Sequence, residues 1–149
     1  MIYVTNSHQH VMMCFRKTTT FISFTKYVLM GNHPDQIDHS ELEKSKVHII
    51  VEIIEYMSNA VVSKTIIKKV TGNVTVSSLD AGEEVAEKTS PYDTFVQVID
   101  GTAELTIRDR SYKLRLGEGI IVPGHVKHRF NAAVPFKMLA TVIKSGYED

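Results

Sequence analysis

The sequence predicts an all-β fold of the sandwich, jelly-roll or closed-barrel type. From residue 61 onward, eight short segments rich in β-branched and aromatic residues follow one another. Closely spaced Gly, Asp, Asn, Arg or Pro residues separate most of these segments and predict turns. No helical pattern interrupts the series, and evenly spaced strands without helices between them are typical of sandwiches and barrels.

The chain is long enough for one domain with a substantial core, since it has 149 residues, 43% of them hydrophobic. Its 17 Lys and Arg residues balance 17 Asp and Glu residues, and neither sign forms a long block. We therefore expect neither nucleic acid nor a membrane as a partner. The single cysteine, Cys14, excludes an internal disulfide and a thiolate zinc site, so the expected location is the reducing cytoplasm.

Residues 1–38 are predicted to be an N-terminal extension outside the domain. Residues 1–30 are rich in Thr, Met and His without a sustained period, and residues 30–35 form a predicted break. Two interpretations stay open. Either the extension is disordered, or the natural chain starts later, with Met30 as the candidate start.

A short helix is predicted over about residues 40–57. Ser40 and Glu43 have the spacing of a capping box, in which each side chain satisfies a backbone donor at a helix start. An apolar stripe at near-helical spacing follows: Leu42, Val47, Ile50, Ile54 and Met57. The β-branched run at residues 48–54 would also suit a strand, but we favour the helix.

The barrel is predicted over about residues 60–145, within a domain of residues 39–149. The eight expected strands are 61–70, 74–79, 95–99, 103–107, 112–116, 119–122, 126–131 and 136–144. Residues 100–101 are expected to form a turn between two of them. The predicted core residues are Val96, Val98, Leu105, Ile107, Ile121, Phe130, Met138 and Leu139.

Two glycine-containing motifs make the prediction more specific. The first runs from Gly82 to Gly101, and the second runs from Gly117 through Pro123 to His128. Together they resemble the two motifs of the small single-domain cupins (cupin type 2), part of the RmlC-like jelly-roll superfamily. The resemblance covers about residues 60–145. It implies a cupin double-stranded β-helix, a jelly-roll barrel preceded by the short helix and the irregular extension.

The resemblance also implies a metal site, and here the sequence departs from the family. Cupins take three metal ligands from the first motif and one histidine from the second. Counted from Gly82, the first-motif positions are Lys88, Ser90 and Thr94, and the second-motif position is His128. Protonated lysine has no lone pair, and serine and threonine are weak neutral ligands. We therefore expect a degenerate metal site.

The same four residues are predicted to line one mouth of the barrel as a ligand pocket. An ammonium group at position 88 supplies positive charge without a metal, which suits a small carboxylate or another anion. We expect a non-catalytic barrel that binds a small molecule or anion, with no cofactor. The plainer alternatives are that Lys88 extends into water and that His128 only binds a hydroxyl of Ser90 or Thr94.

A metal-dependent cupin enzyme, dioxygenase-like or isomerase-like, is the alternative function. A divalent transition metal would then be held by His128, His125 and Asp93. This set requires a bulge or a loop offset, because Asp93 points away from Thr94 on an ideal strand. Asp93 could instead cap a turn, and His125 could lie in water at the rim.

The family also leads us to expect a homodimer. The predicted strand at residues 61–70 is long and apolar, and a second copy could cover its edge by strand exchange. A purely structural interaction domain, whose mouth is filled by its own side chains, is the remaining interpretation.

Overall fold

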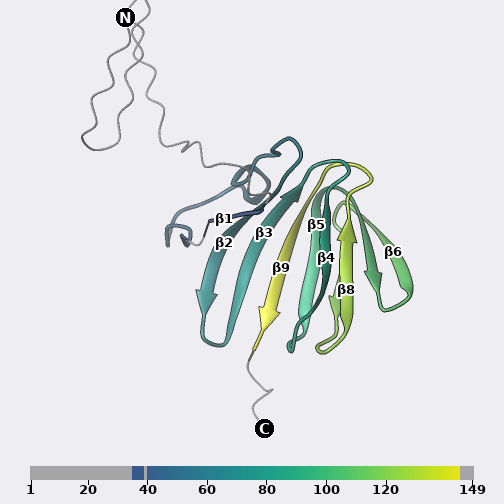
Figure 1. Ribbon diagram of the computed structural model, residues 1–149. Helices are drawn as coiled ribbons and strands as arrows, with labels where there is room; N and C mark the ends of the chain where they lie inside the picture. The colour runs from purple at the N-terminus through teal and green to yellow at the C-terminus, as the bar shows by residue number, and fades with distance from the viewer. Residues whose placement is uncertain (1–34, 39, 145–149) are drawn as a thin grey trace, which may run out of the picture. The chain divides into compact units, whose positions relative to one another are not determined.

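The computed structural model describes residues 35–38 and 40–144 (Figure 1), and this part contains strands and no α-helix. The strands are β1 (Asp35–Asp38), β2 (Val61–Lys69), β3 (Gly72–Leu79), β4 (Glu84–Thr89), β5 (Thr94–Ile107), β6 (Arg110–Arg115), β7 (Gly119–Val122), β8 (Lys127–Asn131) and β9 (Phe136–Ile143). The all-β prediction is confirmed. The predictions for residues 1–34 lie outside the described residues, and β1 falls within the stretch assigned to the extension. No helix of the described part is long and apolar enough to cross a membrane.

Strand β5 joins two sheets. Its first half pairs with β9 and β7, and its second half pairs with β6 and β8. From β9 the first sheet continues through β3 and β2 to the short parallel β1, whereas β8 leads to β4 in the second sheet. The strands curl around a shared interior (Figure 1), which is the predicted jelly-roll arrangement.

A bulge near Gly101 lets β5 pass from one sheet to the other. The register of β5 against β9 shifts between Val98 and Asp100, and Gly101 has a φ of +71°. A Cβ atom at Gly101 would contact the carbonyl oxygen of Pro135, so only glycine fits. The predicted turn at residues 100–101 is therefore wrong, because the strand is continuous there.

The core lies between the two sheets. Its buried members are Leu79, Val96, Val98, Ala103, Leu105, Leu114, Val122, Phe130, Ala132, Phe136 and Met138. Five of the eight predicted core residues are among them, Ile107 packs against them, and Leu139 is half-buried. The prediction for Ile121 is wrong. It is 62% exposed, because it points outward from β7 while Val122 points inward.

The predicted helix at residues 40–57 is wrong, because its first half runs beside β2 instead. Ser45 has a φ of +60°, which an α-helix does not allow. The Leu42 N–H donates to the carbonyl of Ile66 at 3.0 Å, and the Glu41 carboxylate accepts from the Lys68 N–H at 2.8 Å. Hydrogen bonds to a neighbouring strand thus replace the helical ones.

The second half forms a cover segment, residues 50–57, over the outer face of β3, β9 and β5. It contains only a single 3₁₀ turn, Ile50–Glu52. Lys137, 6% exposed, donates to the carbonyl of Val51 at 2.7 Å, and its Nζ lies 4.9 Å from the ring centre of Tyr56. The Tyr56 hydroxyl donates to Asp100 at 2.9 Å. The β-branched run at residues 48–54 is poorly suited to a helix. Its residue Val51 contacts the sheet instead, through Lys137.

Candidate functional site

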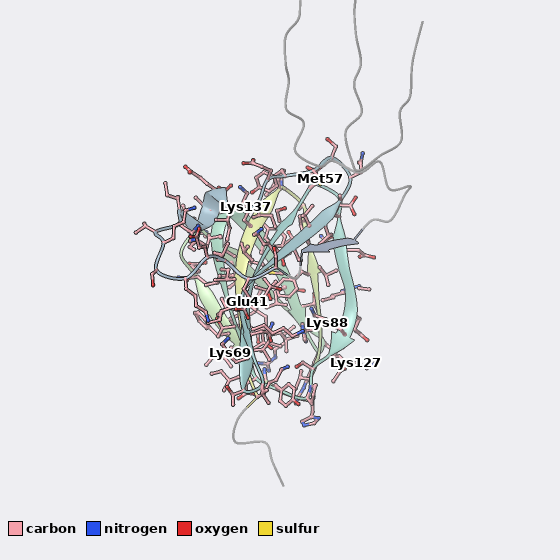
Figure 2. The ribbon with its side chains drawn as sticks, turned by 90° about the vertical axis from the view of Figure 1, so that its left-hand side faces the viewer. Glu41, Met57, Lys69, Lys88, Lys127 and Lys137 are labelled. Carbon is pink, nitrogen blue, oxygen red and sulfur yellow. The ribbon has the colours of Figure 1, made fainter. Side chains whose placement is uncertain are left out.

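The four residues of the predicted pocket come from the two strands β4 and β8, the start of β5 and the loop after β4. Lys88 on β4 and His128 on β8 are directly opposed in the antiparallel register. Ser90 follows the end of β4, and Thr94 is the first residue of β5. We call these four residues the barrel mouth. Figure 2 shows Lys88 and Lys127 near one end of the barrel and Lys137 near the other.

His128 points into the barrel. It is 4% exposed, whereas its neighbours Lys127 and Arg129 are exposed, as the alternation of a strand requires. Its ring lies edge-on to Phe130 with the ring centres 6.2 Å apart. Because directly opposed residues of an antiparallel pair share a face, Lys88 lies on the same side of the sheet as His128.

One nitrogen of the His128 ring is already used. Nδ1 lies 3.1 Å from the carbonyl oxygen of Val126. A carbonyl can only accept, so Nδ1 carries the proton in this bond. Burial lowers the pKa of His128 below its ordinary value, and the Lys88 charge acts in the same direction, while the Val126 carbonyl opposes both. His128 is therefore neutral near pH 7.

Lys88 brings a positive charge to the barrel mouth. No ion pair or hydrogen bond joins Lys88 to another described residue. Its side chain as a whole is exposed, yet the surrounding protein removes enough water from the ammonium group to lower its pKa. The ammonium is thus accessible, partly desolvated and without a counter-charge from the described part of the chain.

The Ser90 hydroxyl makes its hydrogen bonds within the loop after β4. Its hydroxyl donates to the Tyr92 carbonyl and accepts from the Tyr92 N–H, both at 3.1 Å. Its own carbonyl accepts from the His125 N–H at 2.6 Å. The Ser90 side chain therefore closes a local turn.

Thr94 lies on the inner face of β5. It is 9% exposed and shares this face with the buried Val96 and Val98. Its strand neighbours in register are Val122 and Val142. The apolar core therefore begins directly behind Thr94.

The alternative metal ligands do not come together. Asp93 Oδ1 accepts a 2.7 Å hydrogen bond from the Gly124 N–H, and this bond holds the loop after β4 against the loop before β8. His125 is exposed with a φ of +59°. Among residues 35–38 and 40–144, no three His, Cys, Asp or Glu side chains are placed to hold a metal ion. The one histidine, lysine, serine and threonine of the barrel mouth do not fit a transition metal either.

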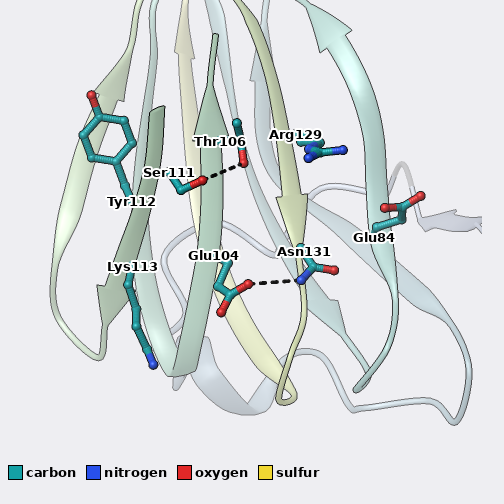
Figure 3. Close-up of a pocket in the computed structure, with 8 residues that line it drawn as sticks. All are labelled: Glu84, Glu104, Thr106, Ser111, Tyr112, Lys113, Arg129 and Asn131. Atoms are coloured by element: carbon teal, nitrogen blue, oxygen red, sulfur yellow. Dashed lines mark hydrogen bonds between the residues drawn. The ribbon is translucent and has the colours of Figure 1, made fainter. Parts of the chain in front are cut away.

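Within the part of the chain that the structure describes, two surface cavities lie outside the barrel mouth. A groove of about 530 Å³ crosses the outer faces of β4, β8, β5 and β6 (Figure 3), and Asn131 donates to Glu104 within it at 3.1 Å. Its lining residues are Glu84, Glu104, Thr106, Ser111, Tyr112, Lys113, Arg129 and Asn131. A second cavity of about 420 Å³ at the rim is lined by Glu87, Arg108, Asp109, His125, Val126 and Lys127.

The sequence alone did not identify this groove or the role of Val126. The alternation along β8 signals that Arg129 and Asn131 face away from His128, but it does not show that three other strands extend the same surface. The Val126 carbonyl is a backbone group, and its position depends on the turn that precedes β8.

Comparisons with known proteins agree with the fold. The family model described as Cupin domain matches residues 75–142, which include both glycine motifs. Protein SchB of Streptomyces halstedii is 33% identical over 72 residues, which cover 48% of this chain and about half, 52%, of that relative.

Two solved structures resemble the chain over most of their length. A conserved protein of unknown function from Streptococcus pyogenes is 30% identical, with a TM-score of 0.67, and the match covers 72% of this chain and 94% of that one. A cupin superfamily protein from Desulfitobacterium hafniense is 25% identical, with a TM-score of 0.65 and coverage of 70% and 96%.

Proposed function

The chain belongs to the cupin family. We propose that its barrel mouth, which is the metal position of the cupin motifs, binds a small carboxylate or similar anion without a metal. The observation that carries this proposal is Lys88. Its ammonium faces the inner side of the sheet opposite His128 and has no acidic partner among the described residues.

The Lys88 ammonium has no counter-charge among the described residues. A cation that loses part of its hydration is stabilised by a nearby anion, and a charge-assisted hydrogen bond is stronger than a neutral one. The neutral ring of His128 adds no second charge to the mouth. A single carboxylate from solution would therefore balance Lys88.

The chemistry of the mouth favours binding over a reaction. A nucleophile or general base needs a partner that activates or orients it. Here the Ser90 hydroxyl is engaged with Tyr92, and the Asp93 carboxylate holds the Gly124 N–H. No activated hydroxyl results from these contacts, and we propose a non-catalytic binding protein.

The test compares Lys88→Met with Lys127→Met. Both variants remove one positive charge from the same end of the barrel, but Lys127 points outward and pairs with Glu87 at 3.1 Å. At constant ionic strength, acetate should raise the melting temperature of the wild type and of Lys127→Met, because a ligand that binds only the folded state stabilises it. Lys88→Met should unfold cooperatively and show no shift. An equal shift in Lys88→Met contradicts the proposal.

We also propose that two copies associate through the outer face of the first sheet. Phe95 and Ile121 are direct neighbours in register, and Thr141 opposes Phe95 on its other side. Ile143 lies two residues further along the same face of β9. Three apolar side chains of this face are exposed: Phe95, Ile121 and Ile143. The cover segment does not reach them, because it contacts the sheet further along, at Ser78, Asp100 and Lys137. A second copy would remove this apolar patch from water. The exchange of β2 stays a prediction.

A further inference from the structure

We propose that the barrel mouth selects α-hydroxy carboxylates over simple carboxylates, with Lys88 binding the carboxylate and His128 Nε2 accepting a hydrogen bond from the hydroxyl group. This inference rests on the proposed function and names the class of ligand. Its basis is a charged donor and a neutral acceptor that the β4–β8 register places opposite each other.

The first step is the tautomer of His128. The 3.1 Å contact from Nδ1 to the Val126 carbonyl fixes the ring proton on Nδ1, since the carbonyl has no proton to give. In the neutral ring, Nε2 then carries a lone pair and can only accept. A ligand atom beside Nε2 must therefore be a donor.

The second step is access to Nε2. No hydrogen bond to Nε2 comes from another described residue. Among the same residues, every side-chain N or O atom that is sealed from solvent has a hydrogen-bond partner. Nε2 lacks a partner, so it is not fully sealed from solvent. Of the two ring nitrogens, one is satisfied by the protein and the other is left for water or a ligand.

The Lys88 and His128 side chains start from neighbouring points on the sheet. Side chains directly opposed on an antiparallel pair have Cβ atoms about 4.5–5.5 Å apart. Lys88 and His128 form such a pair, and the Lys88 charge acts on the His128 ring. An α-hydroxy carboxylate carries its anionic oxygens and its hydroxyl on neighbouring carbon atoms, so one small ligand can bind both groups at once.

The charge of the mouth favours a carboxylate over a phosphate. Lys88 is the one cation among the four residues of the barrel mouth, and a monoanion balances it. Tight phosphate sites use several donors, as helix termini or arginine forks provide. The barrel mouth has neither, because it is built from strands and contains no arginine.

The test is isothermal titration with matched pairs of ligands. Glycolate differs from acetate by one hydroxyl group, and lactate differs from propionate in the same way. We expect each hydroxy acid to bind about three- to tenfold more tightly than its partner, the factor that one net hydrogen bond supplies. Equal affinities within both pairs would overturn this inference and leave the proposed function intact. No binding of any of the four would overturn both.

Two variants separate the roles of the side chains. His128→Asn places an amide N–H near the position of Nδ1, so the bond to Val126 can persist while the acceptor Nε2 is lost. Glycolate and acetate should then bind this variant with about equal affinity. Lys88→Met should lose both ligands, whereas Lys127→Met should keep the wild-type preference. A preference that survives in His128→Asn contradicts the inference.

A spectroscopic measurement covers the case in which His128→Asn does not fold. The imidazole ¹⁵N shifts of the wild-type protein distinguish the two neutral tautomers. We expect a protonated Nδ1 and an Nε2 signal that moves on addition of glycolate more than on addition of acetate. A protonated Nε2, or an Nε2 chemical shift that changes with neither ligand, would overturn the proposal.

Discussion

Among single residues, Lys88 and His128 differ most clearly from the ligands of a metal site. Each takes a cupin ligand position, but one is a cation and the other already donates to the backbone. Both pKa values are lowered, with burial as the largest cause. The lowered pKa of His128 keeps its ring a neutral acceptor near pH 7, and Lys88 supplies the positive charge.

The lowered pKa of His128 predicts a loss of stability in mild acid. In the unfolded chain this ring takes up a proton near its ordinary pKa of 6.5, whereas the folded protein does so only at lower pH. The unfolded state then binds more protons in this window, so the free energy of unfolding decreases as the pH falls below 6.5. Urea denaturation from pH 7 downward should show a smaller decrease for His128→Asn than for the wild type. Equal decreases would exclude His128 as the source.

At the scale of elements, the bend of β5 depends on Gly101. Gly101→Ala should lower the free energy of unfolding by more than about 2 kcal/mol. The new Cβ adds a clash with Pro135 to the strain of a positive φ. Gly117→Ala is the matched control. Gly117 has a φ of +84° with no atom within 4 Å of its Cβ position, so it should cost only the conformational strain, about 1–2 kcal/mol. Chemical denaturation measures both, and equal costs would contradict the role of the bulge.

The cover segment should depend on the Tyr56 hydroxyl. Tyr56→Phe removes the 2.9 Å bond to Asp100 and should lower the free energy of unfolding by about 1–3 kcal/mol, since the acceptor is a carboxylate. Hydrogen exchange at Glu52 and Ile53, whose amides close the 3₁₀ turn, should become faster. Tyr112→Phe should change neither quantity, because the Tyr112 hydroxyl has no partner among the described residues. Unchanged exchange in Tyr56→Phe would show that the segment is held by other contacts.

The strands and the cover segment differ in how well the sequence predicted them. Strand β7 was predicted to the residue, because Gly117 and Pro123 bound it on both sides. The helix prediction failed because a capping-box spacing is a local signal, and contacts of Glu41 and Lys137 with distant strands outweigh it. Motif spacing selected the four barrel-mouth residues, and their use as a binding pocket stays a prediction. The turn that engages Ser90 is a loop detail that spacing does not fix.

At the scale of the whole molecule, the proposed dimer predicts a mass of two chains in light scattering. Ile121→Glu should shift the protein toward the monomer, because it places a charge in the apolar patch formed with Phe95. Leu116→Glu is the control, since Leu116 is equally exposed but lies in the turn after β6. A wild-type protein that is monomeric at high concentration would contradict the proposal.

We propose above all that the barrel mouth binds an anion through Lys88 without a metal. Its most direct test is the titration of glycolate into protein dialysed against EDTA, with the metal content of the same sample measured by elemental analysis. We expect stoichiometric binding by the metal-free wild type and none by Lys88→Met. Binding that disappears with the metal and returns when iron, manganese, nickel or zinc is restored would contradict it.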